Sequence, residues 1–113
     1  MHHHSKSLEE SWKKLSIVEQ LANIGAEVGR TQNWQDKGNL EYKNNAFYRS
    51  LELIDLSLKQ PQRLSILKEL TRLRELLVDF FMGDNQYNST RVQWQKYFYS
   101  FNYAAAMKRE QIS

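Results

Sequence analysis

SIVEQLANIGAEVGRTQ, residues 16–32, is the stretch that decides the fold. Ser16 followed by Glu19 is a capping-box pattern, in which each residue satisfies a backbone N–H group of the other at the start of a helix. At about 100° per residue, one face of that helix then collects apolar and small residues. These residues are Val18, Leu21, Ala22, Gly25, Val28, Gly29 and Gln32. The pattern predicts an amphipathic helix that ends near Asn33.

Two glycines lie four residues apart on that face, at Gly25 and Gly29. Glycine inside a helix costs about 1 kcal/mol relative to alanine, so two of them on a core-facing stripe need a reason. We expect a place where another backbone comes very close to this helix. The alternative is a break in the helix near one of the two glycines.

A second long helix is expected over residues 40–59, after a loop over residues 34–39. Asn39 is its expected cap, and the helix stops before Pro61. Its apolar residues form two stripes on roughly opposite sides. The main stripe is Leu40, Phe47, Leu51, Ile54 and Leu58, and the second is Tyr42, Ala46, Leu53 and Leu56. A helix that is apolar on two sides is either central in its bundle or shared with a partner subunit.

Further helices are expected over residues 62–82, ended by Gly83, and from a cap at Ser89 or Thr90 to Arg109. A capping-box pattern that starts at Ser7 indicates a short extra helix near the N-terminus. Four antiparallel helices with short loops bury all of these stripes. The expected fold is therefore a single all-α domain over residues 7–113, an up-and-down four-helix bundle.

The last of these helices contains WQKYFYSFNY, residues 94–103, in which aromatic side chains are unusually dense. As a helix, this segment buries Trp94, Phe98, Phe101 and Ala105 together. It leaves Tyr99, Tyr103 and Met107 on another face. The alternation of aromatic residues from 97 to 103 also suits a strand, although a lone strand has nothing to pair with.

The composition excludes several kinds of chemistry. The chain of 113 residues has no cysteine, and its only histidines are residues 2–4. We interpret residues 1–6 as the remnant of an expression tag, outside any argument about metals. The rest of the chain offers no thiolate, no histidine base and no glycine-rich phosphate loop. We expect a non-enzymatic protein without a cofactor or a metal ion.

The expected setting is the cytoplasm, without membrane attachment. No apolar run approaches the roughly 20 residues that a membrane-spanning helix needs, and the first 30 residues lack the apolar centre of a signal peptide. The absence of cysteine fits a reducing compartment.

Charged residues at the edges of the apolar stripes are candidates for a polar network or a ligand pocket. Arg74 projects beside Leu67 and Phe81, where a guanidinium group needs an acceptor. Its neighbours Lys68, Arg72, Glu75 and Asp79 are expected to face solvent. The candidate set is Glu41, Arg49, Glu52 and Arg74. The alternative is that the arginines cover the edge of the core or form internal or intersubunit ion pairs.

Two interaction surfaces are also indicated. A partner surface, for a second copy of the chain or for another protein, would use Tyr42, Leu53, Leu56, Tyr99, Tyr103 and Met107. We expect a homodimer. The alternative is nucleic-acid binding by aromatic rings beside basic groups, with Arg91, Lys96, Lys108 and Arg109 as the cations. The net charge of +3 is too small to favour the second hypothesis strongly.

The phrases SWKKLSIVEQLANIGAEVGRTQNW, AFYRSLELIDLSL, RLRELLVDFFMGDNQY and WQKYFYSFNYAAA resemble a group of small bacterial proteins without an assigned activity. The resemblance covers nearly the whole chain after residue 6. The general outline also resembles the four-helix bundles of the HEPN type, some of which are toxin ribonucleases or nucleic-acid accessory proteins. HEPN ribonucleases use an Arg-x4-His motif, and no histidine follows any arginine here. The resemblance therefore implies a non-catalytic member.

Overall fold

The structure is a computed structural model that describes residues 2–112 and the side chains of residues 7–110. All regular structure in this part of the chain is helical. The helices are α1 (His2–Lys13), α2 (Ile17–Asp36), α3 (Leu40–Leu58), α4 (Leu64–Met82) and α5 (Arg91–Ile112). The all-α fold class is confirmed, and residues 94–103 form a helix and not a strand. The expected tag remnant falls on residues whose side chains lie outside the described set.

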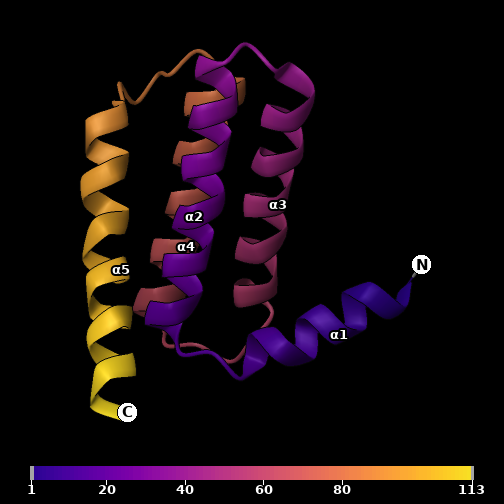
Figure 1. The fold of residues 1–113 in the computed structure, drawn as a ribbon, viewed down its shortest axis with the longest axis vertical. Coiled ribbons are helices and arrows are strands. Elements are labelled where there is room, and N and C mark those ends of the chain that lie inside the picture. Colours follow the sequence, from indigo (N-terminus) through magenta and orange to yellow (C-terminus); the bar gives the residue numbers. More distant parts are fainter. Residues whose placement is uncertain (1, 113) are drawn as a thin grey trace.

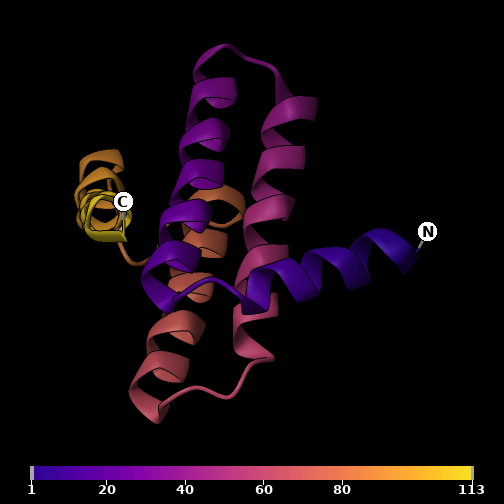
Figure 2. The same ribbon diagram turned by 60° about the horizontal axis from the view of Figure 1, so that its bottom comes forward.

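The helices assemble around α2 and α3. Helices α2 to α5 lie beside one another, and α1 points away from them (Figure 1). Helix α3 packs against α2, α4 and α1, whereas α5 packs against α2. When the molecule is turned, α5 is seen end-on while α2 and α3 are still seen lengthwise (Figure 2). Helix α5 therefore crosses α2 obliquely.

The predicted start of α2 is confirmed. Ser16 N–H donates to Glu19 Oε1 at 3.0 Å, and Glu19 N–H donates to Ser16 Oγ at 3.2 Å, which completes the capping box. Lys108 of α5 donates to the same carboxylate at 3.3 Å. The Ser16 backbone N–H, the Ser16 side chain and then Lys108 lower the pKa of Glu19 below its ordinary value. One carboxylate thus begins α2 and also connects it to the last helix.

Two further caps are confirmed. Asn39 Oδ1 accepts the N–H of Tyr42 at 3.0 Å and begins α3. At the start of α5, Gln93 N–H donates to Thr90 Oγ1 at 3.1 Å, while Thr90 N–H donates to Gln93 Oε1 at 2.9 Å. Thr90, and not Ser89, is therefore the cap of α5.

Two boundary predictions were wrong. The pattern at Ser7 starts no helix, because α1 already begins at His2 and Ser7 lies inside it. Residues 34–36 are helical and not a loop, since α2 continues to Asp36. The extra turn places the Trp34 ring edge-on against Tyr42 of α3, with the ring centroids 4.8 Å apart. This contact extends the packing of α2 on α3 to the end of the helix.

Helix α3 is apolar on two sides because it is central. On its main stripe, Phe47 and Ile54 are only 1% and 0% exposed. The second stripe is buried too, with Leu53 at 5% and Leu56 at 8%. The prediction that Leu53 and Leu56 belong to a partner surface was therefore wrong, because contacts within the chain already cover them. Of that stripe, only Tyr42 is exposed.

A buried polar network joins α1, α2 and α3. Trp12 Nε1 donates to Ser57 Oγ at 2.9 Å, and Ser57 Oγ donates to Gln20 Oε1 at 2.7 Å. Gln20 Nε2 donates in turn to the Trp12 carbonyl at 3.0 Å and to Gln60 Oε1 at 3.1 Å. Gln20 and Ser57 are 1% and 0% exposed, so every one of these bonds replaces a lost contact with water. The network fixes how α1 meets the bundle.

Gly25 is the point where α5 comes closest to α2. A Cβ atom added at Gly25 would lie 2.7 Å from Cβ, Cγ and Cδ1 of Phe98, closer than real side chains approach. At Gly29 an added Cβ would meet nothing within 4 Å. A close approach therefore exists at Gly25 as predicted, but the prediction of a second backbone was wrong, because the Phe98 side chain makes the contact. The predicted close approach is wrong at Gly29, and α2 is unbroken at both glycines.

Replacing each glycine by alanine separates these two environments. Gly25→Ala should destabilise the protein by about 1–3 kcal/mol, because the methyl group overpacks against Phe98. Gly29→Ala should leave stability unchanged or raise it by up to about 1 kcal/mol, because only helix propensity changes. Urea unfolding followed by circular dichroism measures both values. Equal effects of the two substitutions would contradict the position of α5 on α2.

Candidate functional site

Arg74 has a carboxylate partner, as its position on α4 demands. Its Nε donates to Asp55 Oδ1 at 2.8 Å and its Nη2 donates to Asp55 Oδ2 at 3.1 Å, a two-point contact between α4 and α3. These hydrogen bonds raise the pKa of Arg74. The need for an acceptor is confirmed, but the acceptor, Asp55, was not among the candidate residues. The pair is structural, because its two charged groups satisfy each other.

The predicted pocket of Glu41, Arg49, Glu52 and Arg74 is not assembled. Glu41, Arg49 and Glu52 are exposed, and within residues 7–110 none of them is paired with Arg74. Arg49 instead lines a cleft between α1, α2 and α3, beside Trp12. Arg74 pairs instead with Asp55 of α3.

Asp79 was expected only to face solvent, but its partly exposed carboxylate also has a structural role. Its carboxylate accepts the backbone N–H groups of Gln86 at 2.7 Å and Tyr87 at 3.1 Å. Its backbone carbonyl also accepts the N–H of Asn85 at 3.0 Å. Asp79 therefore shapes the connection between α4 and α5, which forms one end of a groove.

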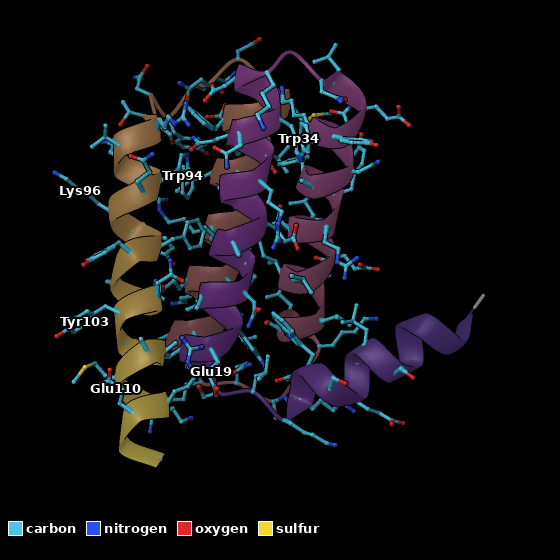
Figure 3. All side chains as sticks on the ribbon, viewed as in Figure 1. Glu19, Trp34, Trp94, Lys96, Tyr103 and Glu110 are labelled. Carbon is cyan, nitrogen blue, oxygen red and sulfur yellow. The ribbon has the colours of Figure 1, made fainter. Side chains whose placement is uncertain are left out.

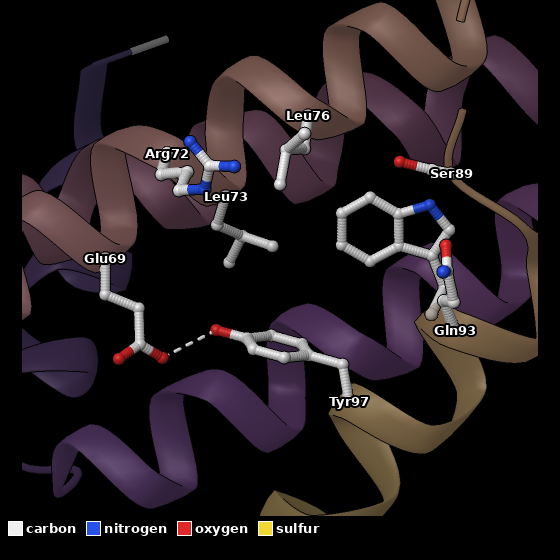
Figure 4. A pocket seen from close by; sticks show the side chains of 8 residues that line it. Glu69, Arg72, Leu73, Leu76, Ser89, Gln93 and Tyr97 are labelled. Atoms are coloured by element: carbon white, nitrogen blue, oxygen red, sulfur yellow. Dashed lines mark hydrogen bonds between the residues drawn. The ribbon is translucent and has the colours of Figure 1, made fainter. Parts of the chain in front are cut away.

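This groove, the α4–α5 groove, has a volume of about 270 Å³ and lies between the two helices (Figure 4). It exists because α5 packs against α2 and makes few contacts with α4. Its apolar walls are Leu73, Leu76, Trp94 and Tyr97. Its polar lining residues are Glu69, Arg72, Ser89 and Gln93. A mainly apolar hollow with a few polar groups is the usual form of a small-molecule site.

One hydrogen bond joins the two walls of the groove at the end away from Ser89 and Gln93. The hydroxyl of Tyr97 donates to Glu69 Oε2 at 2.7 Å, so α5 and α4 are joined at that point (Figure 4). Burial, and secondarily the Glu69 carboxylate, raise the pKa of Tyr97 above its ordinary value. Tyr97 therefore stays protonated at neutral pH and acts as a hydrogen-bond donor. The Glu69 oxygen that accepts this bond is already engaged.

Two donors of the groove have no carboxylate or carbonyl partner within residues 7–110, and one of them, in Trp94, is buried while the other, in Arg72, is exposed. Trp94 is 6% exposed, and its Nε1 has no hydrogen-bond partner among the described residues. Arg72 forms no ion pair within residues 7–110, and its guanidinium group lies 6.0 Å from the centroid of the Tyr87 ring. A buried donor without an acceptor destabilises a protein by about 1–3 kcal/mol, so it needs an explanation.

Several groove residues escaped the sequence analysis. Leu76 and Gln93 were not singled out, Ser89 was considered only as a helix cap, and Trp94 was assigned only to the core. Arg72 was assigned to a solvated face, which agrees with its exposure but misses its place at the groove. The density of aromatic residues after residue 93 was the available signal. This density indicates that α5 carries a large aromatic surface for the other helices to cover. It does not indicate that α4 leaves part of that surface uncovered.

A second feature is the outward face of α5. It carries Val92 (55% exposed), Lys96, Tyr99 (67%), Tyr103 (59%) and Met107 (40%), here called the outward stripe. Lys96 and Tyr103 point away from the other helices (Figure 3). The sequence placed Tyr99, Tyr103 and Met107 on one exposed face, and their exposure is confirmed. Tyr42 is exposed as well, but it lies on α3.

The four basic residues proposed for nucleic-acid binding do not form one surface. Arg91 pairs with Asp36 of α2, and Lys108 pairs with Glu19 at 3.3 Å. Both cations thus serve contacts within the chain. Lys96 lies on the outward stripe among the tyrosines. Arg109 is exposed near the C-terminal end of α5.

The chain matches no protein-family model, and neither characterised proteins nor solved structures show significant similarity to it. The HEPN-like resemblance therefore stays a prediction. Within the described residues, no three His, Cys, Asp or Glu side chains are grouped so as to hold a metal ion. None of the helices in this part of the chain has the length and apolar character needed to span a membrane.

The Arg74–Asp55 pair can be tested against Arg72, which lies two residues away on α4. Arg74→Ala should destabilise the protein by about 1 kcal/mol, the upper part of the range for a partly exposed pair. The expected loss is smaller than for a buried ion pair, because the two side chains are 38% and 45% exposed and water screens their attraction. Arg72→Ala should change stability by less than about 0.5 kcal/mol.

Chemical denaturation of both variants and of Asp55→Asn gives the comparison. Asp55→Asn should resemble Arg74→Ala, since each removes one half of the same pair. If Arg72→Ala proved as destabilising as Arg74→Ala, the assigned faces of α4 would be incorrect.

Proposed function

We propose that this protein is a non-enzymatic interaction module that works as a homodimer. In this proposal the four longer helices form an up-and-down bundle. Helix α5 contacts a second copy of the chain. The outward stripe is the observation that carries the proposal. Three large apolar or aromatic side chains, Tyr99, Tyr103 and Met107, lie exposed on one helix face. Aromatic residues and methionine are enriched in protein interfaces.

The spacing of the outward stripe suits a helix partner. Its residues recur at intervals of three and four, from Val92 to Met107, which keeps them on one side of the helix for more than four turns. Helix α5 lies at the edge of the molecule (Figure 2), and the exposure of Tyr99, Tyr103 and Met107 shows that no other described helix covers this side. A helix from a second molecule can therefore lie along it.

An antiparallel pairing of two α5 helices best buries the apolar side chains of the outward stripe. A two-fold axis near residue 101 places Tyr99 opposite Tyr103 of the partner subunit, so that the same contact is made twice. Lys96 then lies beside Met107 of the partner subunit. The aliphatic stem of Lys96 covers apolar surface there while its ammonium group stays in water. Apolar contact and two-fold symmetry thus favour the same register.

The dimer should be weak. A single pair of helices buries less than the roughly 1,200–2,000 Å² of a standard stable interface. We therefore expect a dissociation constant on the order of micromolar, with exchange between monomer and dimer. Such a module suits reversible association. The absence of cysteine is consistent with a role in the cytoplasm.

Nucleic-acid binding receives less support. Two of its four cations, Arg91 and Lys108, already pair with acids of α2. Only Lys96 stands among the exposed tyrosines, and one cation gives little of the phosphate neutralisation on which such binding depends.

The dimer is tested by placing a charge on the stripe. Tyr99→Glu should abolish self-association, because two carboxylates would be buried beside the tyrosines of the other subunit. Tyr48→Glu is a matched control, since Tyr48 is a comparably exposed (54%) tyrosine on α3. Sedimentation velocity over a concentration series into the high micromolar range measures both variants. A strictly monomeric wild-type protein at these concentrations would remove the proposal.

The antiparallel register has its own test, because the chain contains no cysteine of its own. Tyr99→Cys and Tyr103→Cys are prepared separately, mixed and oxidised. Residues 99 and 103 face each other in the proposed pair, so the mixed disulfide should form in preference to either symmetric one. Preferred formation of a disulfide between two copies of the same variant would indicate a different register.

A further inference from the structure

We propose that the α4–α5 groove binds a small molecule with a flat apolar body, a carboxylate at one end and a neutral hydrogen-bond acceptor at the other. The carboxylate binds Arg72, and the neutral acceptor binds the Trp94 indole N–H. This site is separate from the outward stripe, because the groove lies on the side of α5 that faces α4. It does not depend on the proposed dimer.

The size and lining of the groove define the body of the ligand. A volume of about 270 Å³ falls just below the roughly 300–1,000 Å³ of sites for drug-sized molecules. The ligand is therefore smaller, about the size of one or two fused aromatic rings. Leu73 and Leu76 form the α4 side, and Trp94 and Tyr97 form the α5 side. Aromatic and aliphatic walls of this kind favour a flat apolar molecule.

The polar groups that remain unused around the groove are mostly donors. Gln93 Oε1 already accepts the N–H of Thr90, and the Glu69 carboxylate already accepts the Tyr97 hydroxyl. The Gln93 amide N–H groups, the Arg72 guanidinium and the Trp94 Nε1–H remain as donors, the Ser89 hydroxyl can donate or accept, and the second Glu69 carboxylate oxygen remains as an acceptor. A site in which donors outnumber acceptors selects a ligand that supplies acceptors.

The donors lie at two ends of the groove. Arg72 is at one end, while Ser89 and Gln93 are at the other, with Leu76 between them (Figure 4). Trp94 follows Gln93 directly on α5 and also lines the groove. Arg72 has no carboxylate partner within the described residues, so it is the group that attracts an anion. The ligand acid takes the place of the missing ion pair.

The unpartnered Trp94 nitrogen is the second observation that indicates a ligand. Solvent scarcely reaches this nitrogen, so bulk water does not supply its acceptor. An acceptor can reach the Trp94 nitrogen only if the surrounding side chains shift slightly. A ligand that fills the groove can cause this shift and can also supply the acceptor. Binding would thus relieve a destabilising feature of the unliganded protein.

The probe for this site is 6-hydroxy-2-naphthoate, which carries a carboxylate and a hydroxyl at opposite ends of a flat ring. 2-Naphthol lacks the carboxylate, and 2-naphthoate lacks the hydroxyl. Titrations are followed by the indole N–H resonances of the three tryptophans. The Trp94 resonance should move with 6-hydroxy-2-naphthoate and move less with 2-naphthoate. Trp12, which donates to Ser57, and Trp34, which packs on Tyr42, serve as internal controls.

The charge of Arg72 is tested by comparing acid and alcohol. Wild-type protein should bind 6-hydroxy-2-naphthoate about tenfold more tightly than 2-naphthol, because the acid adds a charge-assisted hydrogen bond. Arg72→Gln should remove that preference. Lys68→Gln, which deletes one positive charge one turn away on α4 and outside the groove, should keep it.

Three results would overturn the proposal. The first is an unchanged Trp94 resonance at saturating 6-hydroxy-2-naphthoate, and the second is equal affinity of the wild-type protein for the acid and for 2-naphthol. The third is an equal loss of preference in Lys68→Gln and Arg72→Gln, which would mean that the acid responds to the overall charge of α4. Circular dichroism of both variants confirms that the fold is retained before the titrations are compared.

Discussion

The close approach of Phe98 to Gly25 determines where α5 lies, and the surfaces of this protein follow from that position. Without a side chain at residue 25, Phe98 can pack directly on the backbone of α2 and become 4% exposed. The Arg91–Asp36 and Lys108–Glu19 pairs connect the two ends of α5 to the two ends of α2. Helix α5 is thereby held obliquely across α2 and makes few contacts with α4. That one placement opens the α4–α5 groove on one side and turns the outward stripe to the exterior on the other.

The remaining helices are fastened by contacts of a different kind. Helices α1, α2 and α3 share the buried network of Trp12, Ser57 and Gln20, whose hydrogen bonds are satisfied within the protein. Helix α4 is held to α3 by apolar packing and by Arg74 with Asp55. Between α4 and α5, however, the Tyr97–Glu69 hydrogen bond is the principal polar contact. The unsatisfied Trp94 N–H donor lies at this boundary, where α4 and α5 share few contacts. A bound ligand would therefore add more stabilising contacts here than between the other helices.

Local features of the fold were readable from the sequence, whereas contacts between helices were not. The caps depend on residues three positions apart, so the sequence indicated Ser16 and Asn39 and narrowed the third cap to Ser89 or Thr90. The partner of Arg74 depends on how α3 is rotated toward α4, which no spacing specifies, and Asp55 was missed for that reason. Gly25 and Gly29 looked equivalent on the helix wheel. They differ because α5 crosses α2 obliquely and meets the first and not the second, and the groove follows from the same crossing.

The most direct test of this account is the set of nuclear Overhauser effects from the α-protons of Gly25 and Gly29 in the wild-type protein. The account predicts strong effects between the Gly25 α-protons and the ring protons of Phe98, with ring-current shifts at Gly25 and neither feature at Gly29. Contacts of the Phe98 ring with Gly29, or with neither glycine, would contradict the position of α5 and with it both proposed surfaces.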